Sequence, residues 1–332
     1  MTASTMEVST TDVKMLEETI VIEPDGDILL TAIPDPGSPR LPDGSKKPSQ
    51  TFRVSSEHLR LGSVYLAGMV KQIMSEAGEL GAKQPYRWNC QDADPDAIRI
   101  ILFLLHNRTR EVPETATNGE MVRLTRLADR FQCLEVIVSS INQWISQVIA
   151  SSTWPSLETT AVVIFLSWKL ELPDYFRSST QEAAILMNKK FNSMELPIPP
   201  LVADAITENR KKGLRTLRKD LKDQRNFLIE HPDDDIHRGC FDIYLATFVR
   251  DTHNSGLDDL LSIVGCSLNI YNILAAFKKY QVRRCLRSKE QCHHVWNIGM
   301  FKQICAREKP HQIVAGLDLR KGGMQMRALK AE

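Results

Sequence analysis

The chain has 332 residues, which is longer than one hydrophobic core usually serves, so we expect two globular domains. Hydrophobic residues make up 42% of the chain and charged residues 25%, which is typical of folded proteins and argues against wholesale disorder. The formal net charge of +1 creates no long-range field, and this disfavours nucleic acid or an anionic membrane as a partner.

Residues 1–18 are rich in serine, threonine and acidic side chains and contain no apolar run typical of a secretory signal, so we expect a disordered N-terminus. The most apolar run, at residues 161–170, is about half as long as a membrane span and predicts a buried helix. The seven cysteines are scattered and odd in number, which favours reduced thiols. We therefore expect a cytoplasmic or nuclear protein.

Two strands are predicted near the N-terminus. Residues 20–33 contain an Asp-Gly pair that favours a turn leading into a strand. Prolines, glycines and serines at residues 34–50 predict a long exposed loop. Residues 51–54 alternate apolar and polar side chains and predict the second strand.

A helical hairpin is predicted to follow at residues 56–74. Ser55 and Ser56 are good N-cap residues, and Gly62 with Ser63 predicts a break between two short helices. The apolar side chains that we expect to point inward are Leu59, Val64, Leu66, Met69, Val70 and Ile73.

A third strand is predicted at residues 85–89, and helices are predicted from there to about residue 150. Asp94 and Pro95 predict the start of one helix, because aspartate is a good N-cap and proline is favoured at the first helical position. Thr117 and Glu120 have the spacing of a capping box, which predicts the start of the next.

Beyond residue 150 the pattern is almost entirely helical. The helices are predicted at residues 158–171, 178–194, 201–230, 239–252, 258–265 and 268–282. Prolines at 196–200 predict an extended connector, so we expect post-domain helices at 151–195 and a helical C-terminal domain at 201–332.

Residues 19–150 resemble a BTB/POZ domain, especially those of filamentous fungi. The resemblance lies in the order of strands, helical hairpin and helical tail, and in the blocks GDILL, FRVSSEHLRLGSVYLAGMV and GEMVRLTRLADRFQC. The apolar and serine positions of the family's hairpin signature match Phe52, Val54, Leu59, Ser63, Tyr65 and Met69. Ser55 stands where the family usually has histidine.

The resemblance implies an α+β fold: a small, mostly three-stranded sheet with helical hairpins, followed by an all-α C-terminal region. It also implies a protein-interaction adaptor. Such adaptors bind their partners through apolar contacts with a polar rim, and they need no cofactor and no small-molecule substrate. The expected partner is a second copy of the chain or a cullin scaffold. In the second case the protein would be a substrate adaptor for a cullin-type ubiquitin ligase.

In BTB dimers of transcription factors, an aspartate and a basic residue form a charged pocket at the dimer centre. Asp27 matches the aspartate, but the basic position is occupied by Ser56. An aspartate without its basic partner is costly to bury, so we expect backbone or hydroxyl groups to donate hydrogen bonds to Asp27.

Further candidate protein-binding residues are Met74, Glu76, Tyr65 and Met69. Met74 and Glu76 match the apolar-x-Glu motif that BTB adaptors use to contact cullins in the loop after the hairpin. The alternative interpretation of the motif is a solvated helix end. Tyr65 and Met69 are hairpin positions of the BTB signature.

Cysteines and histidines are concentrated towards the C-terminus. Cys285, Cys292, His293 and Cys305 are candidate ligands for a structural zinc ion, since zinc requires four such ligands. Their spacing is wider than that of a zinc finger, which favours ordinary buried thiols and surface histidines.

The basic segment 209–225 predicts a helix whose lysines and arginines could contact phosphates. The alternative function is therefore a nuclear transcriptional regulator that contacts nucleic acid through this helix. A solvated helix face is the other interpretation, because leucines supply a core stripe. The sequence contains no phosphate-binding, dinucleotide-binding, zinc-protease or nucleophile-elbow motif, so we do not expect an enzyme.

Overall fold

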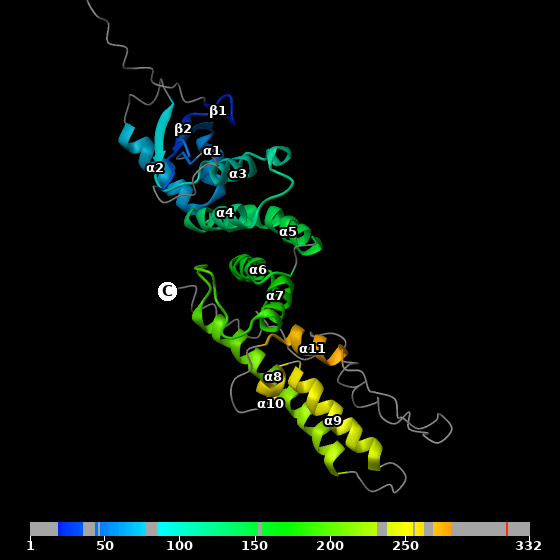
Figure 1. Cartoon of the computed structure of the whole chain (residues 1–332). Coiled ribbons are helices and arrows are strands. Elements are labelled where there is room, and N and C mark those ends of the chain that lie inside the picture. Colours follow the sequence, from blue (N-terminus) through cyan, green and yellow to red (C-terminus); the bar gives the residue numbers. More distant parts are fainter. Residues whose placement is uncertain are drawn as a thin grey trace, which may run out of the picture. The chain divides into compact units, whose positions relative to one another are not determined.

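The computed structural model describes residues 19–35, 44–45, 47–77, 85–151, 155–230, 238–254, 256–261, 268–279 and 317. Its contacts divide the chain into two compact units, Met1–Gln147 and Val148–Glu332. The first unit contains a mixed sheet with helices, and the described elements of the second unit are helices (Figure 1). The predicted α+β class is therefore confirmed.

Four strands form one sheet in the described part of the first unit. They are β1 Ile20–Val21, β2 Ile28–Ala32, β3 Gln50–Val54 and β4 Tyr86–Cys90, in the order β1-β3-β2-β4. The pair β2–β3 is antiparallel, whereas β1–β3 and β2–β4 are parallel. The mostly three-stranded sheet that we expected is thus extended by β1, whose two residues are too few to show an alternating pattern.

The helices that begin in the first unit are α1 Ser56–Gly62, α2 Val64–Ala77, α3 Pro95–Leu105, α4 Asn118–Arg130 and α5 Leu134–Ala150, with a 3-10 turn at Thr109–Glu111. Asp94 caps α3 by accepting from the N–H groups of Asp96 and Ala97. Thr117 and Glu120 form the expected capping box at the start of α4. Both predicted helix starts are confirmed.

The core of the first unit lies between the sheet and its helices. Alternate residues of β2 and β3 are buried, as the two-residue period of a strand requires. Ile98, Ile101 and Leu102 of α3 are also buried. The segment before β3 is anchored by Lys47, whose Nζ lies 2.9 Å from Oδ1 of Asp94, so this part of the predicted exposed loop is attached to α3.

The second unit contains six described helices: α6 Leu157–Lys169, α7 Pro173–Leu186, α8 Pro200–Glu230, α9 Arg238–Asn254, α10 Asp258–Leu261 and α11 Ile270–Lys279. The run from Thr159 to Trp168 in α6 is buried throughout, which confirms the prediction of a buried helix. None of the described helices is long and apolar enough to span a membrane.

One predicted helix is misplaced. The expected helix at 178–194 begins earlier and ends earlier, as α7, because Pro173 is favoured in the first turn of a helix. The backbone at Met187 is extended and leaves the helix. The prolines at 196–200 lie within the second unit, and α7 packs against α8 there.

Arg210 joins three segments of the second unit. Its guanidinium donates hydrogen bonds to the carbonyl oxygens of Met187 at 2.9 Å, Asn188 at 2.5 Å and Leu268 at 3.0 Å. A cation that binds the carbonyls just beyond a helix offsets the negative end of the helix dipole. Arg210 is only 5% exposed, so this member of the predicted basic face is an internal structural residue.

Candidate protein-binding site at the corner between α1 and α2

Two apolar side chains project from the corner where α1 ends and α2 begins. Leu61 is 77% exposed and Val64 is 87% exposed. Between them, Ser63 has an extended backbone, with φ of −170° and ψ of 160°, which separates the two helices. The two side chains therefore flank a sharp break, with Leu61 at the end of α1 and Val64 at the start of α2.

The break is held in place by the Ser63 hydroxyl. Its Oγ accepts a hydrogen bond from the N–H of Leu66 at 3.0 Å, which caps the start of α2. The same hydroxyl donates to the carbonyl oxygen of Phe131 at 2.7 Å, just beyond α4. One side chain thus defines the start of α2 and attaches the corner to another helix.

The ring of Phe131 supports the corner from within. Tyr65 stacks on it with ring centroids 6.0 Å apart, and Trp88 of β4 packs against it at 6.2 Å. The guanidinium of Arg130 lies 5.1 Å from the same ring. Tyr65 is half-buried, so it contributes to the support of the site as well as to its surface.

Gly62 allows α1 to approach α3 closely. A Cβ atom at this position would lie 2.4 Å from Cδ2 of Leu105 on α3, so the Leu105 side chain would have to shift. The glycine therefore allows the end of α1 to lie directly against this side chain.

The start of α1 is capped by an acidic residue from a different part of the chain. Oδ1 of Asp27 accepts from the N–H of Ser56 at 2.7 Å, and Oδ2 accepts from the Ser56 hydroxyl at 2.7 Å. This is the expected arrangement for Asp27, in which backbone and hydroxyl donors replace a basic partner. The negative carboxylate also interacts favourably with the positive end of the helix dipole.

Ser55 does not cap α1 as predicted. Its side chain makes no capping hydrogen bond, because Asp27 already occupies the donors at the helix start. The N–H of Ser55 instead donates to Nε2 of His106 at 3.1 Å. This bond requires an unprotonated Nε2, and Nδ1 lies 2.8 Å from the carbonyl oxygen of Leu102, to which it can donate.

His106 is buried and is therefore favoured in its neutral form. Burial lowers its pKa from the usual 6.5, and the neighbouring His58 and Arg108 act in the same direction. The ring of His58 stacks on it with centroids 4.7 Å apart. Nδ1 of His58 is buried and makes no hydrogen bond to any described residue.

The other candidate residues lie farther along α2. Met69 and Met74 are half-buried, while Glu76 is exposed and accepts a hydrogen bond from Nε2 of Gln72 at 2.8 Å. Met74 and Glu76 belong to the last turn of α2, and not to a loop after it as the motif comparison implied. Asp27 is half-buried, and its carboxylate lies at the start of α1.

The proposed zinc ligands, Cys285, Cys292, His293 and Cys305, lie outside the described residues. Within the described part of the chain, no three His, Cys, Asp or Glu side chains are grouped in a way that could hold a metal ion.

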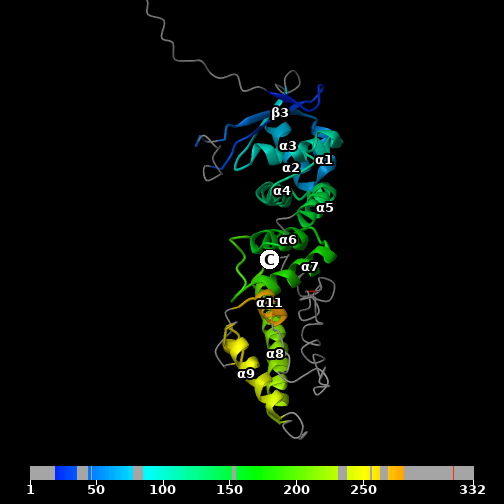
Figure 2. The ribbon, with the colours of Figure 1, turned by 45° about the vertical axis from the view of Figure 1, so that its right-hand side comes forward.

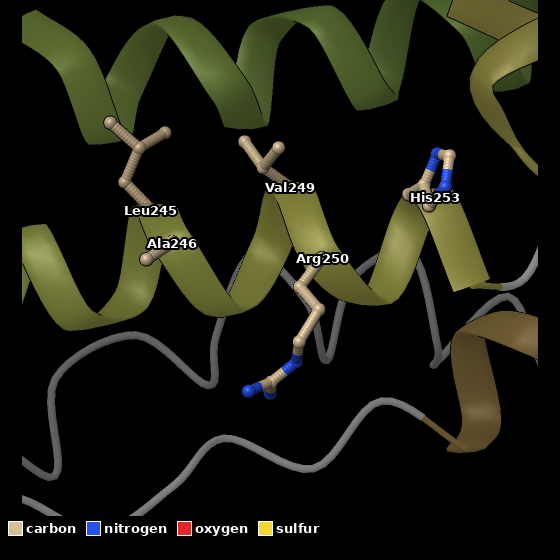
Figure 3. Close-up of a pocket in the computed structure, with 5 residues that line it drawn as sticks. All are labelled: Leu245, Ala246, Val249, Arg250 and His253. Carbon is tan, nitrogen blue, oxygen red and sulfur yellow. The ribbon is translucent and has the colours of Figure 1, made fainter.

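A hollow of about 560 Å³ lies against α9 in the second unit. It is lined by Leu245, Ala246, Val249, Arg250 and His253, and the guanidinium of Arg250 points away from Leu245 and Val249 (Figure 3). Nδ1 of His253 lies 2.6 Å from Oδ2 of Asp258. The five lining side chains provide one imidazole, and that imidazole is paired with Asp258.

Val64 was expected to point into the core, and this expectation is wrong because its side chain is exposed. Leu66 and Val70 are buried and define the inward face of α2. Val64 precedes Leu66 by two residues, which is about 200° around a helix, and this places it on the opposite face. The spacing of the buried residues in α2 would have predicted that Val64 is exposed. The prediction failed because α1 and α2 were assigned one common inward face across the break between them.

No protein-family model matches the chain, and no curated protein matches it significantly. The functional interpretation therefore depends on the mixed α+β fold and on the chemistry of the surfaces described above.

Replacing Asp27 with alanine should lower the free energy of unfolding by about 1–3 kcal/mol, because the buried donors of Ser56 lose their acceptor. Ser55→Ala should change it by less than about 0.5 kcal/mol, because that hydroxyl makes no cap. Urea unfolding followed by circular dichroism measures both. Equal losses in the two variants would show that Asp27 does not cap α1.

Acidification should destabilise the first unit through His106. Because its pKa is lowered in the folded state, the contribution of neutral His106 to stability is complete above the ordinary pKa of 6.5. It is lost as the pH falls below that value towards the folded-state pKa. The unfolding free energy of His106→Gln should therefore depend less steeply on pH between about 7 and 5 than that of the wild type. If urea titrations give the two proteins the same dependence of unfolding free energy on pH, His106 is not the group responsible.

Proposed function

We propose that this protein is a protein–protein interaction adaptor built on a BTB/POZ-like domain at residues 19–150. Two features support the proposal: a mixed sheet with a helical hairpin between its strands β3 and β4, and the signature positions of the hairpin. Phe52, Val54 and Leu59 are buried at the positions where the BTB signature has apolar residues. An adaptor of this kind would act in the cytoplasm or the nucleus.

The exposed pair Leu61 and Val64 is the observation that carries the proposal. Single exposed apolar residues are common on protein surfaces. These two flank the same break, and the Ser63 hydroxyl attaches that break to the carbonyl oxygen of Phe131 just beyond α4. A rigid apolar projection loses little conformational entropy when it enters a partner's pocket, which favours binding.

The first partner class is a second copy of this chain or another protein with an apolar pocket. Ser56 makes the charged dimer pocket of transcription-factor BTB domains a poor model, since both of its donors are used by Asp27. Self-association would instead use the apolar corner, by burial of Leu61 and Val64.

The variant Leu61→Glu with Val64→Glu should abolish association through the corner, because it would place two carboxylates in an apolar contact. Light scattering measures self-association, and affinity purification from the native cell measures binding to other proteins. The matched control is Leu201→Glu with Val249→Glu, which changes the same residue types at exposed positions of α8 and α9.

The corner is the binding site if only the variant with Leu61→Glu and Val64→Glu shows a lower molar mass in light scattering or a loss of co-purified proteins. If both variants retain every association, or both lose them to the same extent, the exposed pair Leu61 and Val64 is not a binding site. The adaptor proposal would then lack its main support. Circular dichroism and melting temperature establish that the variants are folded.

A more specific form of the proposal is a substrate adaptor for a cullin-type ubiquitin ligase. The motif lies in the last turn of α2, where Met74 is half-buried and Glu76 is exposed. Half-burial leaves part of the Met74 thioether for a partner, and methionine adapts readily to apolar pockets.

Met74→Ala combined with Glu76→Ala should reduce recovery of a cullin by about tenfold or more in a pull-down, since both contacts are removed. Lys71→Ala, an exposed change earlier on α2, is the control and should leave recovery unchanged. Undiminished recovery by the double variant would exclude this motif as the contact.

The alternative of a nuclear regulator that binds nucleic acid through residues 209–225 is less favoured. Arg210 is engaged with three carbonyl groups inside the second unit. Arg215 is paired with Glu208 at 2.9 Å. The remaining exposed cations of this helix are better suited to a protein partner than to nucleic acid.

A further inference from the structure

The helix α8 has two chemically distinct faces. One face packs into the second unit, where α7 and α9 contact it, and α9 lies beside it in both views (Figure 1 and Figure 2). The buried residues of that face are Val202, Ile206, Arg210, Leu217 and Leu221. The opposite face is exposed and carries basic side chains.

We call five exposed cations of α8 the basic stripe. They are Lys211, Lys212, Arg215, Lys219 and Lys222. With 3.6 residues per turn, these positions fall within an arc of about 100°, on the side opposite Leu217 and Leu221. At about 1.5 Å per residue, the stripe is about 16 Å long.

The charges of the basic stripe are only partly neutralised. Glu208 pairs with Lys211 at 3.5 Å and with Arg215 at 2.9 Å, at the N-terminal end. Lys212, Lys219 and Lys222 form no ion pair with any residue that the structure describes. Three ammonium groups therefore remain available, one near the N-terminal end of the stripe and two in its C-terminal part.

The composition of the stripe favours a protein partner over a nucleic acid or a membrane. Between Lys211 and Lys222, the apolar residues of α8 are leucines, of which Leu217 and Leu221 are buried, and no aromatic side chain occurs. Single-stranded nucleic acid would need aromatic stacking, and a membrane would need apolar side chains to insert.

We propose that the basic stripe docks an acidic segment of another protein. Its carboxylates would be spaced about 6 Å apart, as glutamates at every fourth residue of a helix are. Charge complementarity would select this segment and set its rate of association. The surface lies on the second unit and does not depend on the corner between α1 and α2, so the two binding functions can be tested separately.

The test uses the full chain and a fluorescent synthetic helical peptide, about four turns long, with glutamate at every fourth position. Anisotropy titrations compare the wild type with Lys212→Glu/Lys219→Glu. We expect the dissociation constant to rise by about tenfold or more in the variant, and binding by the wild type to weaken with added salt. Lys212→Gln/Lys219→Gln removes the charges without repulsion and should show a smaller loss.

The matched control is Lys71→Glu/Lys189→Glu, which makes the same charge change at exposed residues outside α8 and should leave binding unchanged. A duplex DNA of similar length and phosphatidylserine vesicles serve as the competing probes. Equal loss in control and stripe variants, or no binding of the peptide, would overturn the proposal. So would stripe-dependent binding of the DNA or the vesicles that is tighter than binding of the peptide.

Discussion

The carboxylate of Asp27 is the group on which the geometry of the first unit depends. It accepts hydrogen bonds from the backbone N–H and the hydroxyl of Ser56, the first residue of α1. The backbone carbonyl oxygen of Asp27 accepts a hydrogen bond from the N–H of Tyr86 in β4. One residue thus connects the start of β2, the start of α1 and the edge strand of the sheet. Buried donors that lack an acceptor are costly, so α1 is held in one direction, and the corner at its far end is positioned as a result.

Arg210 has a corresponding role in the second unit. A single guanidinium binds three carbonyl groups that lie beyond the end of α7 and before α11. A buried arginine is tolerated because its Nε and Nη2 groups donate to these acceptors. In both units, therefore, one charged side chain satisfies backbone groups that the secondary structure leaves open.

The two proposed surfaces use different physics. The corner offers Leu61 and Val64, whose burial by a partner would be favoured by the hydrophobic effect and would be insensitive to salt. The basic stripe offers Lys212, Lys219 and Lys222, whose contribution would be electrostatic and screened by ions. An adaptor with one surface of each kind could hold one partner by apolar contact and select another by charge.

Local patterns in the sequence were sufficient for the elements that are stabilised by neighbours in the chain. Asp94 and the pair Thr117 and Glu120 start α3 and α4 as expected, because capping bonds join residues two or three positions apart. The apolar run in α6 likewise indicated its burial. These features depend only on short-range hydrogen bonds and on helical periodicity.

Only the tertiary structure determined the partners of groups that are distant in sequence. It assigned the cap of α1 to Asp27 instead of Ser55 and placed Arg210 inside the second unit. It also added β1 to the sheet through pairing with β3. A residue's sequence neighbours determine which bonds it can make locally, but burial and long-range pairing depend on which segments meet when the chain folds. That is why the starts of α3 and α4 were predictable and the distant bonds of Asp27 and Arg210 were not.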